Sequence, residues 1–154
     1  MRSHPPDQEH TDEHMIKVEV NLDDTPGEWL GFVMDKLFEA GANDVYYTPI
    51  YMKKNRPAVQ LQLLCSQSKF EDIKQIILSE TTTLGIRYYP ITVFRMERRT
   101  RVIETEYGNI TVKEGLQDNQ VIKSSPEYED CKQLAEKHQV PLKDVYAAVW
   151  RKLK

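Results

Sequence analysis

The stretch "MIKVEVNLDDTPGEWLGFVMDKLFEAGANDVYY", residues 15–47, decides the fold. Apolar and polar residues alternate over residues 16–22, which is typical of a half-buried strand. A helical pattern follows, because Pro26 suits the first turn of a helix and Gly41 ends one. A second strand is expected over residues 45–51. The stretch therefore predicts a strand, a helix and a strand in succession.

The predicted helix carries a stripe of apolar side chains. They recur three and four residues apart, so they share one side of the helix. We expect the whole stripe to belong to the core rather than to a cofactor site: Trp29, Leu30, Val33, Met34, Leu37 and Phe38.

The pattern continues beyond the second strand. Apolar residues at 59, 61 and 63 alternate with glutamines and predict a third strand, a second helix is expected over residues 69–80, and residues 91–96 predict a fourth strand. The order β-α-β-β-α-β is that of the ferredoxin-like fold, in which two helices cover one face of an antiparallel sheet. We therefore predict an α+β protein with a ferredoxin-like βαββαβ domain over residues 15–97.

A small α+β domain is predicted over residues 98–154. It begins with a β-hairpin about residues 107–109 and adds a short strand near residues 121–122. Two helices follow. Ser125 is the expected cap of the first helix, with Pro126 in its first turn, and Pro141 opens the second.

Composition limits the classes of function. The 154 residues carry a formal net charge of −3, which argues against duplex nucleic acid as the main partner. There is no run of roughly 20 apolar residues and no apolar core of a signal peptide at the start, so we expect a cytoplasmic protein without a membrane span. Cys65 and Cys131 lack CxxC spacing and are expected to be buried core residues.

The first fourteen residues, "MRSHPPDQEHTDEH", are almost free of apolar side chains. Such a segment cannot bury enough surface to order itself, so we predict a disordered His-rich tail or the end of a linker. His4, His10 and His14 with their acidic neighbours suit loose binding of a divalent metal. The alternative is an inert solvated tail.

Acidic residues follow the first strand in "NLDDTPGE". Asp23, Asp24 and Glu28 offer hard oxygen ligands of the kind that Mg²⁺ or Mn²⁺ prefers, with substrate phosphates completing the shell. In the alternative interpretation, Asp24 caps the helix and Glu28 interacts with the positive end of its dipole.

Two further segments carry groups that can hold an anion. In "MKKNRP", the cations Lys53, Lys54 and Arg56 lie on a hairpin loop and suit a triphosphate, unless they form an ordinary solvated turn. In "ETTTLGIR", residues 81–83 and Arg87 predict a polar turn that presents hydroxyl and backbone N–H donors. The alternative is that the threonines bond nearby carbonyls.

The strand order bears on whether these segments meet. We expect the end of the first strand and the start of the third to point to opposite edges of the sheet, which argues against a single site within one subunit. A homo-oligomer would reunite the segments across an interface.

Three long motifs, "VEVNLDDTPGEWLGFVMDKLFEAGANDVYYTPIYMKKNRPAVQLQLLC", "ETTTLGIR" and "SSPEYEDC", together resemble the C-terminal part of the LarC-type nickel insertion proteins. The resemblance runs from about residue 15 to the end of the chain. The chain departs from the pattern at Thr25 and Ala58, where a Met-like residue and a Gly are expected.

The resemblance implies a CTP-dependent cyclometallase, a nickel chelatase-type lyase. Such an enzyme inserts Ni²⁺ into pyridinium-3,5-bisthiocarboxylic acid mononucleotide and so makes the nickel-pincer cofactor of lactate racemase. The chain would be its CTP-binding portion, working with the N-terminal portion of the same enzyme in a homo-oligomer.

The resemblance also implies roles for individual residues, although it assigns no catalytic residue. Glu127 or Tyr128 would lie near the base or ribose of CTP, and Mg²⁺ or Mn²⁺ would be bound by Asp23, Asp24 and Glu28. The triphosphate would be held by Lys53, Lys54, Arg56, Thr81, Thr82, Thr83 and Arg87.

Two other functions are compatible with the predicted fold. One is a small-anion-binding or regulatory module that drives oligomerisation without catalysis, since this fold hosts many functions. The other is binding of single-stranded RNA on the sheet face through Tyr46, Tyr47 and Tyr51, which the acidic balance of the chain disfavours.

Overall fold

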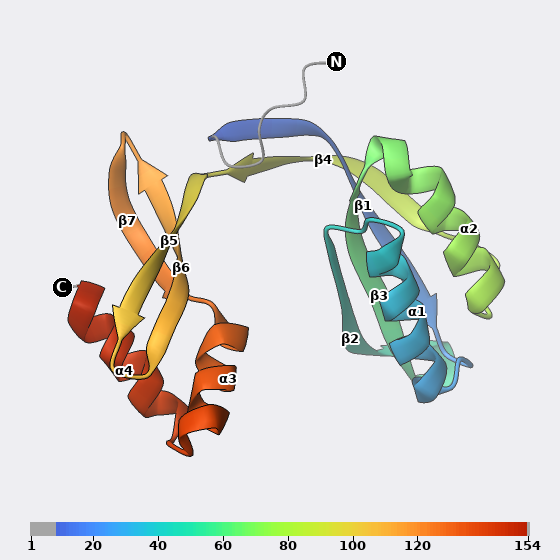
Figure 1. Cartoon of the computed structure of the whole chain (residues 1–154). Coiled ribbons are helices and arrows are strands. Elements are labelled where there is room, and N and C mark those ends of the chain that lie inside the picture. The colour runs from blue at the N-terminus through green and yellow to red at the C-terminus, as the bar shows by residue number, and fades with distance from the viewer. Residues whose placement is uncertain (1–8, 154) are drawn as a thin grey trace. The chain divides into compact units, whose positions relative to one another are not determined.

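The computed structural model describes residues 9–153, and the chain forms two compact units (Figure 1). The N-terminal unit consists of Asp12–Val93. The C-terminal unit consists of the residues from Phe94 onward, together with the described residues before Asp12. None of the helices in the described part of the chain has the length and apolar character needed to cross a membrane.

The N-terminal unit contains a four-stranded sheet whose strands lie in the order β2-β3-β1-β4. This order, with a helix after β1 and another after β3, is the ferredoxin-like arrangement, as predicted. Short 3₁₀ turns lie before β3 and before α2. The elements are β1 (His10–Leu22), α1 (Gly27–Glu39), β2 (Asp44–Met52), β3 (Arg56–Ser66), α2 (Phe70–Glu80) and β4 (Arg87–Arg95).

Three strands begin at least three residues earlier than the sequence pattern indicates. One is β3, which starts at Arg56 and not at residue 59, so Arg56 belongs to the strand and not to the predicted hairpin loop. β1 starts at His10, within the predicted tail, and β4 starts at Arg87 instead of residue 91. The side chains that begin these strands are largely exposed, so the burial alternation that predicts a strand is missing there. Residues 1–8 of the predicted tail, including His4, lie outside the described residues.

The core of this unit lies between the sheet and the two helices. Fully buried side chains come from β1 and β3 on one side, and from both helices on the other: Val18, Val20, Leu61, Leu63, Cys65, Val33, Leu37, Ile73 and Ile77. Cys65 is buried as predicted, and burial raises its pKa to about 11. The alternation within the strands thus identified the inward face correctly.

The apolar stripe of α1 is only partly in the core, which corrects the prediction. Leu30, Val33 and Leu37 are buried, but Trp29 is 52% exposed and Phe38 is 46% exposed. Because each residue turns the helix by about 100°, the stripe is wider than the strip that one sheet can cover. Its outer residues therefore face solvent.

The C-terminal unit packs two helices against a three-stranded antiparallel sheet of order β5-β6-β7. Its core includes Ile110, Val112 and Cys131, and burial raises the pKa of Cys131. The elements are β5 (Glu97–Thr105), β6 (Gly108–Gln117), β7 (Gln120–Pro126), α3 (Tyr128–His138) and α4 (Leu142–Leu153).

The predicted cap of the first C-terminal helix is wrong. Ser125 and Pro126 belong to β7, and α3 begins after Glu127, which makes no side-chain capping bond. Instead, Asp130 in the first turn of α3 accepts a hydrogen bond of 2.7 Å from the backbone N–H of Thr111. That bond ties the helix to β6 and lowers the pKa of Asp130.

Candidate functional site

The end of β1 lies beside the start of β3, so the expectation that they point to opposite edges is wrong. The two strands are antiparallel, and Leu22 pairs with Val59. In antiparallel neighbours, the end of one strand always lies next to the start of the other. Arg56 and Asp23 therefore meet within one subunit, with 3.3 Å between Nη1 and Oδ2.

The basic loop lies next to this ion pair. Residues Lys53–Asn55 form a 3₁₀ turn between β2 and β3, and all three side chains are exposed. Lys54 and Asn55 have left-handed backbone conformations, with φ of 62° and 55°, which is uncommon for residues other than glycine. Among the described residues, neither Lys53 nor Lys54 takes part in the hydrogen bonds and ion pairs of the unit. The loop thus presents two unengaged ammonium groups.

The three threonines after α2 behave differently from one another. Thr81 donates to the carbonyl of Ile77 at 2.7 Å, and Thr83 donates to the carbonyl of Gly85 at 2.8 Å. These two follow the local-carbonyl alternative. Thr82 instead contacts the segment after β1, where its hydroxyl bonds the carboxylate of Asp24 and lies 2.8 Å from the hydroxyl of Thr25.

Asp24 does not cap α1, so the alternative interpretation of this residue is wrong. The helix begins after Pro26 and has no side-chain cap, while Asp24 is bonded to Thr82. Glu28 lies in the first turn of α1 and is exposed. Within the described part of the chain, no group of three or more acidic, His or Cys residues is arranged to hold a metal.

A metal site here would accordingly rest on Asp23 and Asp24. Mg²⁺ usually keeps several waters and is bound by one or two carboxylates together with substrate phosphates. Two adjacent carboxylates beside cations satisfy that requirement for Mg²⁺ or Mn²⁺ bound with a nucleotide.

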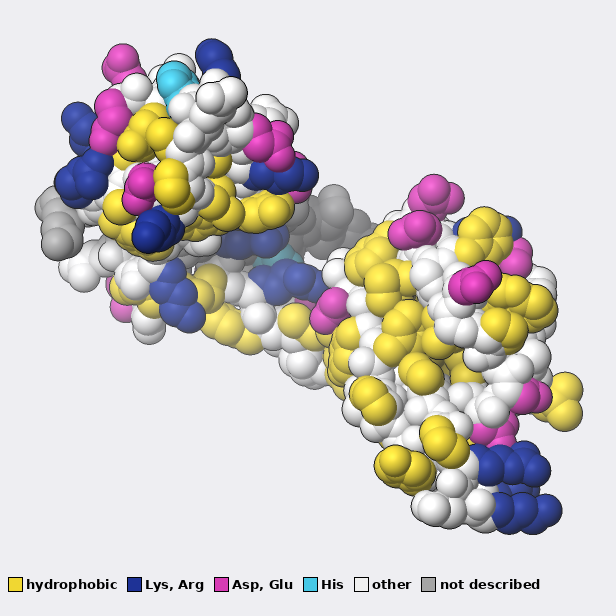
Figure 2. All heavy atoms as spheres, turned by 90° about the horizontal axis from the view of Figure 1, so that it is seen from below, with side chains coloured by type: hydrophobic (Ala, Val, Ile, Leu, Met, Phe, Trp, Pro, Cys, Tyr) yellow, Lys and Arg dark blue, Asp and Glu magenta, His cyan; other side chains and the backbone are white. Residues whose placement is uncertain are grey.

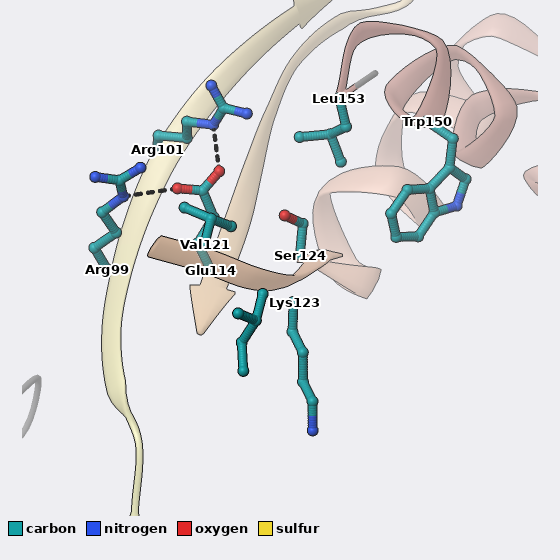
Figure 3. A pocket seen from close by; sticks show the side chains of 9 residues that line it. Arg99, Arg101, Glu114, Val121, Lys123, Ser124, Trp150 and Leu153 are labelled. Atoms are coloured by element: carbon teal, nitrogen blue, oxygen red, sulfur yellow. Dashed lines mark hydrogen bonds and ion pairs between the residues drawn. The ribbon is translucent and has the colours of Figure 1, made fainter. Parts of the chain in front are cut away.

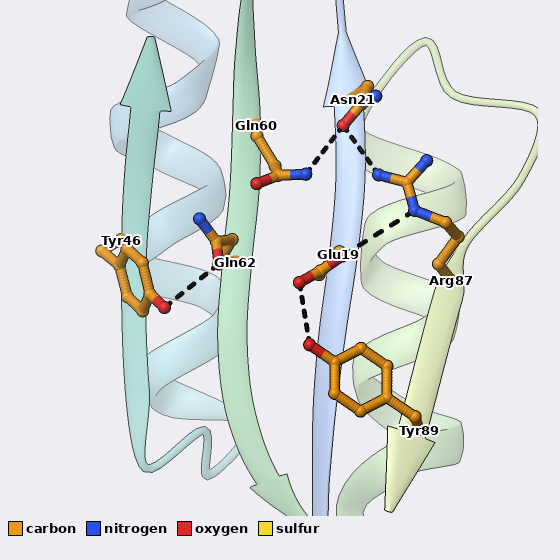
Figure 4. A network of polar contacts seen from close by, with 7 residues as sticks. All are labelled: Glu19, Asn21, Tyr46, Gln60, Gln62, Arg87 and Tyr89. Atoms are coloured by element: carbon orange, nitrogen blue, oxygen red, sulfur yellow. Dashed lines mark hydrogen bonds and ion pairs between the residues drawn. The ribbon is translucent and has the colours of Figure 1, made fainter. Parts of the chain in front are cut away.

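Arg87 belongs to a polar network on the open face of the sheet (Figure 4). Its Nη2 donates to the side-chain oxygen of Asn21 at 2.8 Å, and its Nε lies 3.8 Å from Glu19. Gln60 donates to the same oxygen of Asn21, and Tyr89 donates to Glu19 at 2.9 Å, a bond that raises the pKa of Tyr89. The network fixes Arg87 against the end of β1, where its partner Asn21 lies two residues before Asp23 in the sequence.

The three tyrosines proposed for RNA binding do not share one face of the sheet. Tyr46 lies on the open face and hydrogen-bonds Gln62 (Figure 4). Tyr47 points to the helix side, where its hydroxyl donates to the carbonyl of Leu30 at 2.6 Å. Burial raises its pKa to about 12. The three tyrosines therefore do not form one stacking platform, which argues against the RNA hypothesis as stated.

Glu127 and Tyr128 belong to the C-terminal unit. Glu127 forms an ion pair of 2.5 Å with Lys113, and Tyr128 is 52% exposed at the start of α3. The other candidate nucleotide-binding and metal-binding residues belong to the N-terminal unit. Their proposed position near the base or ribose stays a prediction.

The sequence pattern missed a pocket between α1 and α2. Its volume is about 340 Å³, and its lining includes Trp29 and Phe32 of α1 with Ser79, Glu80 and Thr81. The helical spacing of Trp29 predicts that it is buried, so the sequence pattern does not reveal that its ring is exposed in this pocket. Hydrophobic side chains are prominent on the face of the N-terminal unit that is shown in Figure 2.

A family model described as "nickel insertion protein" matches residues 3–146 of the chain. The chain belongs to the nickel insertion protein family. Two relatives are named pyridinium-3,5-bisthiocarboxylic acid mononucleotide nickel insertion protein. The protein from Thermotoga petrophila is 47% identical over 141 residues, which are 92% of this chain and 36% of the relative. The protein from Geobacillus kaustophilus is 50% identical over 139 residues, which are 90% of this chain and 34% of the relative.

A solved structure extends the match to the whole fold. It is described as LarC2, the C-terminal domain of a cyclometallase involved in the synthesis of the NPN cofactor of lactate racemase, in its apo form. The TM-score is 0.86 at 40% identity, over 93% of this chain and 96% of that one. The chain spans about a third of the length of the curated relatives it matches, and it corresponds to this C-terminal portion of the family.

Proposed function

We propose that the chain is the CTP-binding portion of a nickel insertase that acts on pyridinium-3,5-bisthiocarboxylic acid mononucleotide. The full enzyme would be a cyclometallase, a lyase of the nickel chelatase type, and its product the nickel-pincer cofactor. Support comes from the names of the relatives and from the cyclometallase domain with the same fold. Because those relatives are nearly three times as long, the remaining steps would need an N-terminal portion of the same enzyme.

The observation that carries the proposal is the meeting of cations and carboxylates at one end of the sheet. Arg56 contacts Asp23, and Thr82 bonds Asp24. A triphosphate bound with a divalent metal needs both kinds of group, since cations neutralise its oxygens while carboxylates complete the metal shell. Lys53 and Lys54 are exposed and add positive charge beside these groups.

Each residue would have a defined task in this arrangement. Lys53, Lys54 and Arg56 would bind phosphate oxygens, Asp23 and Asp24 would hold the metal, and Thr82 would fix the orientation of Asp24. Mg²⁺ or Mn²⁺, when bound, would stabilise negative charge that develops on the leaving pyrophosphate. Nickel is the substrate metal, and the sulfurs of the pyridinium compound are soft ligands suited to it.

Trp29 and Phe32 give the proposal a place for a planar ring. Thr81 lines their pocket and adjoins Thr82 in the chain, so a nucleotide held by its phosphates has an aromatic-lined space of about 340 Å³ nearby. Aromatic side chains favour stacking of planar rings.

Calorimetric titration of the 154-residue chain with CTP, with and without Mn²⁺, tests the proposal. We expect saturable binding that needs the metal, and chromatography of the nucleotide products would show whether this portion alone breaks CTP down. Light scattering with and without CTP would test for a homo-oligomer. No binding at millimolar CTP would refute the proposal, whereas binding and assembly without any role in nickel insertion would favour the non-catalytic module.

A further inference from the structure

A charged residue occupies a core position in the sheet of the C-terminal unit. On β6, buried residues alternate with exposed ones, and Glu114 stands between the buried Val112 and Leu116. The Glu114 side chain is only 1% exposed. Burying a carboxylate is costly unless it is paired and hydrogen-bonded, so its partners need an explanation.

Two arginines of the neighbouring strand pair with this carboxylate (Figure 3). The Nε of Arg99 lies 2.7 Å from Oε2 of Glu114, and the Nε of Arg101 lies 2.7 Å from Oε1. Both contacts use the inner nitrogen, and in Figure 3 the terminal nitrogens of Arg101 point away from Glu114. The two guanidinium groups are therefore oriented by the carboxylate, and their terminal nitrogens remain available to another anion.

Stability alone does not account for this arrangement. A buried ion pair is often no more stable than apolar residues of similar volume. One carboxylate also balances only one of the two arginines, and both side chains are about half exposed, at 55% and 48%. The excess positive charge thus faces solvent on a pre-oriented pair, which is the geometry in which arginine binds phosphate.

The arginines open into a pocket of about 610 Å³. Lys123 and Ser124 of β7 line it on one side, and Trp150 and Leu153 of α4 line it on another. Its volume lies within the range of small-molecule sites, roughly 300–1,000 Å³. The pocket therefore combines two arginines with an exposed indole, since Trp150 is 43% exposed.

We propose that this pocket binds a pyridinium mononucleotide, with its phosphate group on Arg99 and Arg101 and its ring against Trp150. A phosphate monoester suits the paired guanidinium groups, and a pyridinium ring is a flat cation that the face of an indole attracts. Naming this ligand class rests on the proposed function. A neutral base such as cytosine lacks the cation–π attraction to the indole. We therefore expect this pocket to prefer a pyridinium mononucleotide, and the polar end of the N-terminal unit to prefer CTP.

Tryptophan fluorescence tests this inference directly. The chain has two tryptophans, so in a Trp29→Phe background Trp150 is the only reporter. Titration with nicotinate mononucleotide, a commercially accessible pyridinium mononucleotide, should quench Trp150 in a saturable manner. Excess inorganic phosphate should reverse the quenching, because it competes for the arginines.

Two variants locate the binding. Arg99→Gln/Arg101→Gln/Glu114→Gln removes the pair without leaving a buried unpaired charge, and should weaken binding at least about tenfold. Lys123→Ala, at an exposed position, should weaken it a few fold while the thermal unfolding curve stays unchanged. Both are made in the Trp29→Phe background.

The control is Lys53→Ala/Arg56→Ala, which should bind nicotinate mononucleotide normally. Quenching that stays linear, or that is equal in the triple variant and in Lys123→Ala, would be collisional and would overturn the inference. Loss of binding in the Lys53/Arg56 control would overturn it as well, because it would assign the ligand to the N-terminal unit. Normal binding of nicotinate mononucleotide by the Trp29→Phe chain, together with no binding of CTP by the parent chain that keeps Trp29, would refute the proposed function and leave this inference intact.

Discussion

Replacing Lys53 and Arg56 by alanine should lower the affinity for metal-bound CTP by at least about 100-fold. Each lost charge-assisted hydrogen bond to phosphate removes about 1.5–3 kcal/mol, and two of them give about 3–6 kcal/mol, or two to four orders of magnitude in Kd. Stability should hardly change. The Lys53 side chain is exposed, and the 3.3 Å pair between Arg56 and Asp23 is a surface ion pair worth at most about 1 kcal/mol.

Calorimetric titration with CTP and Mn²⁺, next to thermal unfolding, separates the two effects. A loss of at most about 1 kcal/mol of stability corresponds to a melting temperature within about 8 °C of the parent for a unit of this size. Lys132→Ala/Lys137→Ala is the matched control, because it removes two exposed cations from α3 in the C-terminal unit. A Kd within threefold of the parent, or an equal loss in the control, would refute the reasoning and return the loop to an ordinary solvated turn.

Three further outcomes are expected. Thr82→Val should weaken CTP binding with Mn²⁺ about tenfold by freeing the Asp24 carboxylate, whereas Thr83→Val, which loses a local bond, should change it less than about twofold; calorimetry distinguishes them. Tyr47→Phe should lower the free energy of unfolding in urea by about 1 kcal/mol through its lost 2.6 Å bond, and an unchanged midpoint would contradict this. Burial raises the pKa of the Cys65 thiol to about 11, so the unfolded chain loses this proton at a lower pH than the folded chain, and the free energy of unfolding in urea should decline from about pH 9 to 11. In Cys65→Val this decline should be smaller but still present, because the pKa of Cys131 is raised as well; an equal decline would contradict this.

The fold followed from the sequence because its local signals agree with one another. Alternation in β1 and β3 matches the residues that the structure buries, among them Val18, Val20 and Leu63. Within the helix predicted over residues 69–80, Phe70, Ile73 and Ile77 recur at helical spacing, and the structure buries all three on α2. Such patterns record burial, and burial is what holds the sheet and helices together.

The candidate site was harder to predict because its contacts join distant segments. The bond between Thr82 and Asp24 spans 58 residues, and nothing in "ETTTLGIR" distinguishes Thr82 from its two neighbours, which bond local carbonyls. The pairing of Asp23 with Arg56 did follow from the strand order, once the antiparallel direction of β1 and β3 is applied. The expectation of opposite edges was wrong because the antiparallel direction of the two strands was not applied, although the predicted strand order already implies it.

Glu114 shows a different limit of sequence patterns. In "NITVKEGL", a glutamate at the position of the alternation that should be apolar reads as a break in the strand or as an exposed residue. The structure explains why a glutamate is tolerated at this buried position: Arg99 lies opposite Glu114 on the neighbouring strand and forms an ion pair with it. A charged residue that interrupts an apolar alternation is therefore a signal for a partner on the next strand.

Both positive sites of this weakly acidic chain include a carboxylate, and the carboxylate has a different effect in each. Asp23 shares an exposed ion pair with Arg56, so an arriving phosphate or metal can exchange with either partner at little cost. Glu114 is buried and holds both of its arginines through Nε, so a ligand adds to the pair without separating it. Pre-orientation reduces the entropy lost on binding, whereas an exchangeable pair permits release. A nucleotide that must be bound and then discharged suits the first arrangement, and a mononucleotide that must be held in one position suits the second.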